Sequence, residues 1–123
     1  RLIMSGLLDE FPTLRLVCPH LAGTLPYIVG RLDHQVNVLK RGPRNLARSP
    51  VEYLKSIWTD VVSPLPLAIK FGHEFFGPGR LLFSSDHPWV EPEVIVRCVS
   101  EARLPAADEA RLYSANARHL FRL

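Results

Sequence analysis

The sequence contains little cysteine, since only Cys18 and Cys98 occur among its 123 residues. A small secreted scaffold held together by disulfide bonds would carry more, so we expect a protein of a reducing compartment, the cytoplasm. No apolar run is long enough to span a bilayer, and we expect no membrane partner. The sequence opens on Arg1, with neither an initiator methionine nor a signal peptide, which favours a piece of a longer protein.

A dense cluster of positive charge is also absent. Lysine and arginine number 15 against 12 aspartates and glutamates, which gives a net charge of +3, and the arginines are scattered along the chain. Nucleic-acid binding requires a basic stripe, so we expect no nucleic-acid partner. With 47% hydrophobic and 22% charged residues, the composition is that of an ordinary globular protein. Residues 1–123 are long enough for one domain with its own core.

Strand-like and helix-like segments alternate along the chain. The expected strands cover residues 14–20, 57–62 and 80–85. The expected helices are the end of a helix over 1–10, a helix over 25–38, helices beginning at Ser49 and Ser63, one over 92–102, one from Pro105 and one over 116–121, with a basic loop over 40–48. This order predicts an α/β fold with parallel strands and crossover helices. Three strands cannot close a barrel of eight, so we expect the last three strands of a (β/α)₈ barrel whose other strands would precede Arg1.

The helix that begins at Ser49 has the clearest start. Ser49 is able to cap the helix, Pro50 suits the first helical position, and Glu52 completes a capping box.

Two of the expected strands stop at an ionisable residue. His20 ends the first strand and Asp86 ends the third. A (β/α) barrel places its chemistry at the carboxyl ends of its strands. A histidine there acts as a metal ligand or a general acid/base, and an aspartate acts as a metal ligand or accepts a proton from bound water.

Structural roles compete with these functional ones. His20 could merely cap the strand or bond a backbone carbonyl, and Asp86 could form the turn before Pro88. Cys18 could act as a thiol nucleophile beside His20, but a small core residue is the simpler interpretation. Asp60, late in the middle strand, could support the site from behind or serve a salt bridge or turn.

Other residues near the expected site are less specific. His87 follows Asp86 and could line the pocket mouth, and Trp89 is a candidate lid or pocket wall or else a core residue. We expect three further histidines on solvated or amphipathic helix surfaces: His34, His73 and His119.

Taken together, these residues resemble the amidohydrolase-related family, which includes aminocarboxymuconate-semialdehyde decarboxylase and the resorcylate-type decarboxylases. The likeness covers nearly the whole chain in order. Its His-x-x-Gly and Ser-Asp-x-Pro elements are weak singly and more specific together. The matching residues are Phe11 to Val17, His20 to Pro26, Gly30 and Arg31, Asp60, Gly77, Leu81 to Trp89, and Asn116 to Phe121.

The resemblance implies a metal-dependent (β/α)₈ barrel that holds a divalent metal ion, with zinc as the expected ion. It casts His20 as the histidine that polarises or protonates the substrate or bound water. It casts Asp86 as a metal ligand and proton carrier. Arg31 matches an arginine that reaches a neighbouring subunit's substrate carboxylate, although a helix-surface arginine is the alternative, and we take Arg31 and Trp89 as candidate substrate-binding residues.

The chain also departs from the family pattern. The family's His-x-His pair and the metal histidine after its fifth strand are absent and would lie before Arg1. Ala22, Ser84 and His87 replace residues that are usual in relatives, so the substrate stays open. A zinc site needs about four ligands, so we expect the isolated 123 residues to be inactive.

The function that follows is part of a metal-dependent hydrolase or decarboxylase acting on a small carboxylate or amide-type substrate. In a decarboxylase, His20 or metal-bound hydroxide would bring a proton to the substrate carbon. In a hydrolase, metal-bound water would attack a carbonyl while Asp86 accepts its proton. We expect a homo-oligomer. The alternative is a non-catalytic half-barrel that acts only as a packing or oligomerisation module.

Overall fold

The computed structural model describes residues 1–42 and 46–123, so part of the expected basic loop over 40–48 lies outside the described residues. In chain order the elements are α1 (Leu7–Glu10), β1 (Val17–Cys18), the 3₁₀ turn η1 (His20–Ala22), α2 (Leu25–Asp33), the π-helical turn η2 (His34–Val38), α3 (Pro50–Ser56), β2 (Trp58–Asp60), α4 (Pro66–Phe76), β3 (Leu81–Leu82), α5 (Pro92–Ala102), α6 (Ala106–Ala110), the π-helical turn η3 (Arg111–Ala115) and α7 (Asn116–Phe121).

The three strands form one parallel sheet in the order β1-β2-β3. Val17 is in register with Trp58, and Thr59 is in register with Leu81. Helical segments connect the strands, so the predicted α/β fold with parallel crossovers is confirmed. The sheet is small and open, and it does not by itself form a barrel.

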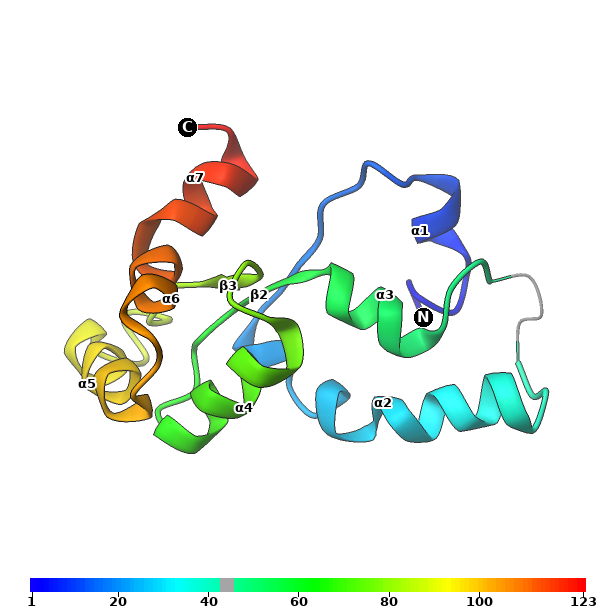
Figure 1. Cartoon of the computed structure of the whole chain (residues 1–123), viewed down its shortest axis with the longest axis horizontal. Coiled ribbons are helices and arrows are strands. Elements are labelled where there is room, and N and C mark those ends of the chain that lie inside the picture. Colours follow the sequence, from blue (N-terminus) through cyan, green and yellow to red (C-terminus); the bar gives the residue numbers. More distant parts are fainter. Residues whose placement is uncertain (43–45) are drawn as a thin grey trace.

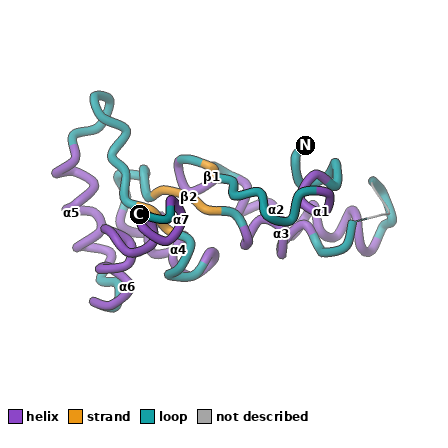
Figure 2. Tube along the Cα trace, turned by 90° about the horizontal axis from the view of Figure 1, so that it is seen from above, coloured by secondary structure: helices purple, strands orange, loops and turns teal. Residues whose placement is uncertain are grey.

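Figure 1 shows how the helices surround this sheet. The strands lie at the centre, with α2 and α3 on one side and α5, α6 and α7 on the other. Helix α4 packs against α5, and α2 packs against α3. Figure 2 shows the same order from above, with the strands between these two groups of helices. In the described ranges, no helix is both long and apolar enough to cross a membrane.

The strands are shorter than the sequence predicts. Runs over 14–20, 57–62 and 80–85 yield paired segments of only two or three residues each. Apolar runs report burial rather than pairing, and a residue joins a ladder only where a neighbouring strand lies opposite it. Some flanking residues still bond across the sheet: the Trp58 N–H donates to the Leu16 carbonyl at 2.8 Å, and the Val61 N–H donates to the Leu82 carbonyl at 3.1 Å.

Two expected helix starts are also wrong. The first helix covers only Leu7–Glu10, because Gly6 before it has the left-handed φ of 79°. The helix after β2 begins at Pro66 and not at Ser63. Leu65 is extended, with φ −144° and ψ 113°, which is the conformation that a following proline favours. Pro66 then occupies the first turn, where its missing N–H costs nothing.

The capping box at Ser49 is confirmed. The Ser49 hydroxyl accepts the Glu52 N–H at 3.2 Å, and the Glu52 carboxylate accepts the Ser49 N–H at 2.9 Å. The helix expected over 25–38 is also present, as α2 continued by η2.

The main core lies between the sheet and the surrounding helices. Its largest fully buried side chains include Tyr53, Leu54, Ile69, Leu81 and Ile95. A second cluster on the other face consists of Trp58, Leu82 and Leu120. The consecutive residues Leu81 and Leu82 therefore serve opposite faces, as the alternation of a strand requires.

Helix α7 is fastened to the start of β3 by a buried amide. The Asn116 side chain donates to the carbonyls of Pro78 and Leu81 at 2.7 and 2.8 Å. These bonds satisfy two carbonyls beside the edge strand and set the position of the last helix.

Candidate active site at the strand ends

His20, Asp60 and Asp86 lie at the carboxyl-terminal end of the sheet, which we call the His20 and Asp86 edge. His20 follows β1 by two residues, Asp60 is the last residue of β2, and Asp86 follows β3 by four. All three strands are parallel, so their carboxyl ends meet on one side. The expected convergence of the strand ends is therefore present in the fold.

The backbone around His20 has an uncommon conformation. His20, Leu21 and Ala22 have φ of 56°, 52° and 59°, all in the left-handed region. Non-glycine residues seldom adopt this region, and three in succession require support from their surroundings. The turn closes on itself, since the Gly23 N–H donates to the His20 carbonyl at 2.8 Å. Leu21 is buried, whereas His20 is exposed at the mouth of the turn.

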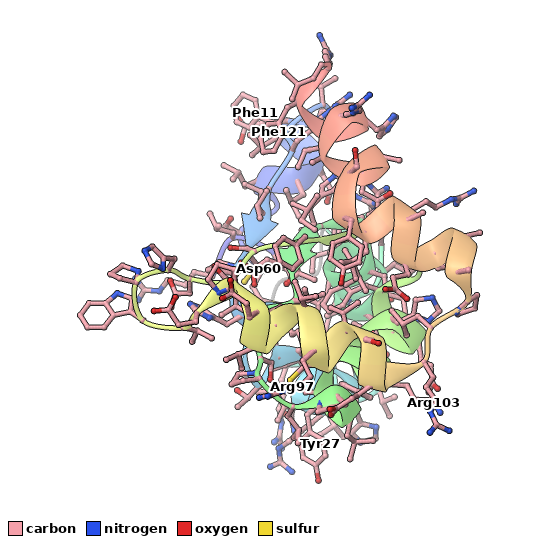
Figure 3. All side chains as sticks on the ribbon, turned by 90° about the vertical axis from the view of Figure 1, so that its left-hand side faces the viewer. Phe11, Tyr27, Asp60, Arg97, Arg103 and Phe121 are labelled. Atoms are coloured by element: carbon pink, nitrogen blue, oxygen red, sulfur yellow. The ribbon has the colours of Figure 1, made fainter. Side chains whose placement is uncertain are left out.

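Asp60 supplies that support. It is only 9% exposed, and its Oδ1 accepts the backbone N–H of His20 at 2.8 Å. The same oxygen accepts the Val62 N–H at 3.0 Å. A single carboxylate thus fixes the turn after β1 to the segment after β2. In Figure 3 Asp60 lies at the centre of the molecule beside the sheet.

The expectation for Asp60 was only partly correct. It serves a turn, as one interpretation had it, because its Oδ1 accepts the N–H of Val62 two residues on. In the described part of the chain it forms no salt bridge, and support of the site from behind stays a prediction. Its role as an acceptor for the His20 backbone was not foreseen. Only the position of an aspartate at a buried strand end pointed to it, because a hydrogen bond across 40 residues leaves no local pattern.

Helix α4 leaves room for the His20 turn through Gly72. A Cβ at this position would lie 2.6 Å from the Leu21 Cδ2 atom. Glycine therefore allows the buried Leu21 side chain to seat against the helix, and this contact supports the left-handed turn from below.

Asp86 lies in a turn and presents its side chain to solvent. Its φ is 65°, and its carbonyl accepts the Trp89 N–H at 2.9 Å. No side-chain hydrogen bond to its carboxylate occurs among residues 1–42 and 46–123. Asp86 does help to form the turn before Pro88, but through its backbone, which leaves the carboxylate available. The His87–Pro88 peptide bond is cis.

The remaining candidates lie on exposed positions. Trp89 is 84% exposed, so it does not pack in the core of the described residues, and a role as a lid or pocket wall stays a prediction. Arg31 is exposed on α2, and its contact with a substrate stays a prediction too. His87 Nδ1 lies 3.7 Å from the Glu91 carboxylate, with both side chains mostly exposed, so this pair adds little stability.

Cys18 behaves as a core residue. It is half-buried and packs against the main core. Burial, together with the negative charge of Asp60, raises the pKa of its thiol. Because the thiolate is the reactive form, this environment disfavours the nucleophile interpretation.

Of the helix histidines, His73 is not a solvated surface residue. Its Nε2 lies 3.0 Å from the Asp108 carboxylate, and the two side chains are only 17% and 21% exposed. The pair joins α4 to α6. His34 and His119 are exposed as expected, although the His119 ring also lies 6.0 Å from that of Trp58.

A metal site is not complete within the part of the chain that the structure describes. No group of three or more His, Cys, Asp or Glu side chains gathers there to hold an ion. The donor chemistry nevertheless fits one position, because the Asp86 carboxylate is uncommitted and divalent cations favour carboxylate oxygen. A complete site would need further ligands from outside these residues.

The sequence of the chain is similar to those of known proteins. A family model described as amidohydrolase matches residues 1–123. The chain is 32% identical over 127 residues to 6-methylsalicylic acid decarboxylase of Penicillium expansum, covering 98% of this chain and 38% of that protein. It is 31% identical over 112 residues to 2-amino-3-carboxymuconate-6-semialdehyde decarboxylase of Caenorhabditis elegans, covering 89% of this chain and 27% of that protein.

The same likeness holds in three dimensions. A crystal structure of dihydroxybenzoic acid decarboxylase from Polaromonas sp. JS666, with bound manganese and the inhibitor 2-nitroresorcinol, superposes with a TM-score of 0.87 at 26% identity. The match covers 99% of this chain and 38% of that one. The chain thus spans well under half the length of these relatives, and it belongs to the amidohydrolase family.

Proposed function

We propose that this chain contributes the last three strands of a (β/α)₈ barrel in a metal-dependent decarboxylase of small aromatic carboxylates. Three strands of eight agree with the 38% of a relative's length that the chain covers. The parallel order β1-β2-β3 supports the same placement. The observation that carries the function is the position of His20 and Asp86 at one sheet edge, on either side of Asp60.

The reaction would replace a carboxylate on a ring carbon by hydrogen. The bond between the ring carbon and the carboxylate carbon breaks, its electron pair stays on the ring, and carbon dioxide leaves. A proton must reach the same ring carbon. His20 is the proposed donor, because it stands exposed on a turn whose backbone Asp60 holds fixed. Regeneration of the donor takes a proton from solvent.

A bound divalent cation would supply Lewis-acid attraction for the negatively charged substrate. Manganese, which the decarboxylase from Polaromonas contains, is as good a candidate here as the zinc that the sequence suggested. Asp86 is the residue of this chain that would hold the ion. On the present donor set the isolated chain would bind metal weakly and would not turn over substrate.

Two exposed side chains are the proposed substrate contacts. Trp89 has an uncovered indole ring that suits packing on an aromatic substrate. Arg31 carries a guanidinium that suits a carboxylate. The two cysteines, both free, are consistent with the proposed cytoplasmic location.

A role as a non-catalytic packing module is the less favoured alternative. The relatives compared above are decarboxylases, and the decarboxylase assignment also accounts for His20 and Asp86. A packing module requires neither an exposed histidine on a strained turn nor an uncommitted carboxylate at the same end of the sheet.

The experiment uses the complete protein that carries this chain, purified and supplied with manganese or zinc. Carbon dioxide release is measured with 2,6-dihydroxybenzoate, 6-methylsalicylate and 5-carboxyvanillate, the substrates that the names of relatives indicate. An aryl amide of similar size serves as the hydrolase control. Release of carbon dioxide from one acid, without hydrolysis of the amide, supports the proposal. Amide hydrolysis alone, or no reaction with either class, contradicts it.

A further inference from the structure

A strongly basic cavity lies at the opposite end of the strands, their amino-terminal end. It has a volume of about 460 Å³ and lies where the chain enters the strands, beside Leu16 before β1, Ile57 before β2 and Arg80 before β3. Four arginines line it: Arg15, Arg48, Arg80 and Arg122. We name these side chains and the space between them the basic cavity. It is distinct from the His20 and Asp86 edge, because parallel strands separate their two ends.

The protein balances the positive charge of the basic cavity only in part, since the charge of Arg48 interacts with the carboxylates of Asp9 and Glu52. Its lining contains no aspartate or glutamate. Within residues 1–42 and 46–123, no ion pair joins any of the four arginines to a carboxylate. Like charges gathered in a hollow repel one another and focus a positive potential. A bound anion would relieve that repulsion.

Several of the guanidinium groups are held in place before any ligand arrives. Arg80 lies over the ring of Trp58, with 4.9 Å between the guanidinium carbon and the ring centroid. Arg48 lies over the ring of Tyr53 at 4.4 Å. Stacking occupies the flat face of a guanidinium and leaves its N–H edge free to donate.

Arg15 is fixed by the end of α7. Its Nη1 donates to the carbonyls of Leu120 and His119 at 2.7 and 3.2 Å. These bonds use one nitrogen of the guanidinium and leave its other N–H groups available to a ligand. The entropy cost of ordering the long side chain is thus met by the fold rather than by ligand binding.

The mouth of the basic cavity is apolar. Phe11 and Phe121 are 50% and 60% exposed, and they line an adjoining hollow that shares Arg15 and Arg122 with the cavity. Figure 3 shows the two phenyl rings close together at the same end of the molecule. Exposed rings beside paired guanidiniums suit a ligand with a charged head and an organic body.

We propose that the basic cavity binds a small, multiply charged anion, namely the phosphate or pyrophosphate group of an organic phosphate. Four guanidiniums exceed what a single carboxylate can neutralise, and the arginine fork matches tetrahedral phosphate oxygens. The site is independent of decarboxylation, because it shares no residue with the edge that carries His20, Asp60 and Asp86.

The test is titration of the complete protein that carries this chain with inorganic pyrophosphate and then with inorganic phosphate, at low salt. The heat of binding is measured by isothermal titration calorimetry. The expected result is saturable binding, tighter for pyrophosphate than for phosphate, that weakens as sodium chloride is raised. Absence of a saturable response to either probe overturns the proposal.

Variants assign the binding to the cavity. Arg48→Gln and Arg80→Gln should each weaken pyrophosphate binding by about tenfold or more, because each removes a charge-assisted hydrogen bond. Arg97→Gln is the matched control, since Arg97 is exposed on α5 at the opposite end of the molecule from Phe11 and Phe121 (Figure 3). The affinity of this variant for pyrophosphate should stay within about twofold of that of the unsubstituted protein. An equal loss of pyrophosphate affinity in Arg97→Gln would show that the anion is attracted by the overall positive charge and would overturn the proposed site.

Two further steps keep the test decisive. Circular dichroism melts show which variants fold, and Arg48→Gln alone suffices if the loss of the stack on Trp58 unfolds Arg80→Gln. Arg80→Lys retains the charge without the fork. Partial retention of affinity in Arg80→Lys supports guanidinium recognition, and unchanged affinity in Arg48→Gln and Arg80→Gln together overturns it.

Discussion

The backbone N–H of His20 donates to the Asp60 carboxylate at 2.8 Å, although 40 residues separate them. The same carboxylate oxygen accepts the N–H of Val62. This arrangement fixes the turn after β1 to the end of β2, and it holds His20 in a left-handed conformation that the residue would otherwise leave. The position of the candidate proton donor therefore depends on a buried residue that touches only its backbone.

The first prediction concerns Asp60. Asp60→Ala leaves the N–H groups of His20 and Val62 without an acceptor, and it should lower the free energy of unfolding by about 2–4 kcal/mol. Asp60→Asn retains an oxygen acceptor and should cost about 1 kcal/mol. Urea unfolding measures both values. Asp33→Ala is the control, because the Asp33 carboxylate accepts one exposed bond from Asn37 and should matter little. Equal costs at Asp60 and Asp33 would contradict the role given to Asp60.

The second prediction concerns pH and the contact between α1 and α3. The Tyr53 hydroxyl donates to both oxygens of the Asp9 carboxylate at 2.5 Å. This bond, followed by the N–H of Ala47, lowers the pKa of Asp9 below its ordinary value of 3.8. A carboxyl group whose pKa is lower in the folded chain than in the unfolded chain stabilises the fold at any pH where it is ionised in both states. This stabilisation is lost as the pH falls through the pKa of the folded state.

The stability difference between the wild-type chain and Tyr53→Phe should therefore be constant above about pH 5 and shrink below pH 4. Thermal melts at closely spaced pH values measure it. Ser56→Ala, which removes a hydroxyl bonded to a carbonyl of the same helix, is the control and should give a difference that does not change with pH. A Tyr53→Phe difference that grows toward acid pH would refute the assignment.

The third prediction concerns His73 and Asp108. Their side chains meet at 3.0 Å between α4 and α6 and are largely shielded from water. A double-mutant cycle with His73→Gln and Asp108→Asn should yield a coupling free energy of about 1 kcal/mol, more than an exposed pair supplies. His87 and Glu91, 3.7 Å apart and exposed, form the comparison cycle. The two cycles should differ clearly, and a coupling near zero at His73 would show that the contact is incidental.

The fourth prediction concerns the free edge of β1. Among the described residues β1 pairs only with β2, and its outer side borders an apolar hollow of about 300 Å³ lined by Leu16, Val17 and Cys18 among others. An open apolar strand edge favours pairing with another chain. Sedimentation should show association of the isolated chain that rises with concentration, and Val17→Lys should reduce it. A monomer at all concentrations would contradict this expectation.

The sequence predicted the order of helices and strands because both depend on local patterns. The apolar run within residues 80–85, the capping box at Ser49 and Pro92 at a helix start each act over a few residues. The strand bounds could not be predicted equally well, because pairing depends on which neighbour lies opposite. The start at Pro66 was missed although its cause is local, since Pro64 offers a similar pattern two residues earlier.

The candidate site divides in the same way. His20 and Asp86 became candidates because strand ends can be recognised along the chain. The contact of Asp60 with the His20 backbone and the hydrogen bond between His73 and Asp108 were missed, since both join residues distant in sequence. The basic cavity was missed for the same reason: its arginines look scattered in the sequence and gather only when the strands' amino ends come together.

The central claim is tested most directly by measuring bound manganese and carbon dioxide release on the same preparations of the complete protein and two variants. Asp86→Asn should lose most of the metal and most of the activity, because an amide is a poor ligand for a divalent cation. His20→Ala should lose turnover and keep much of the metal, because its proposed role is proton transfer. If His20→Ala loses all the metal while Asp86→Asn keeps both metal and rate, the assignment of the two residues is wrong.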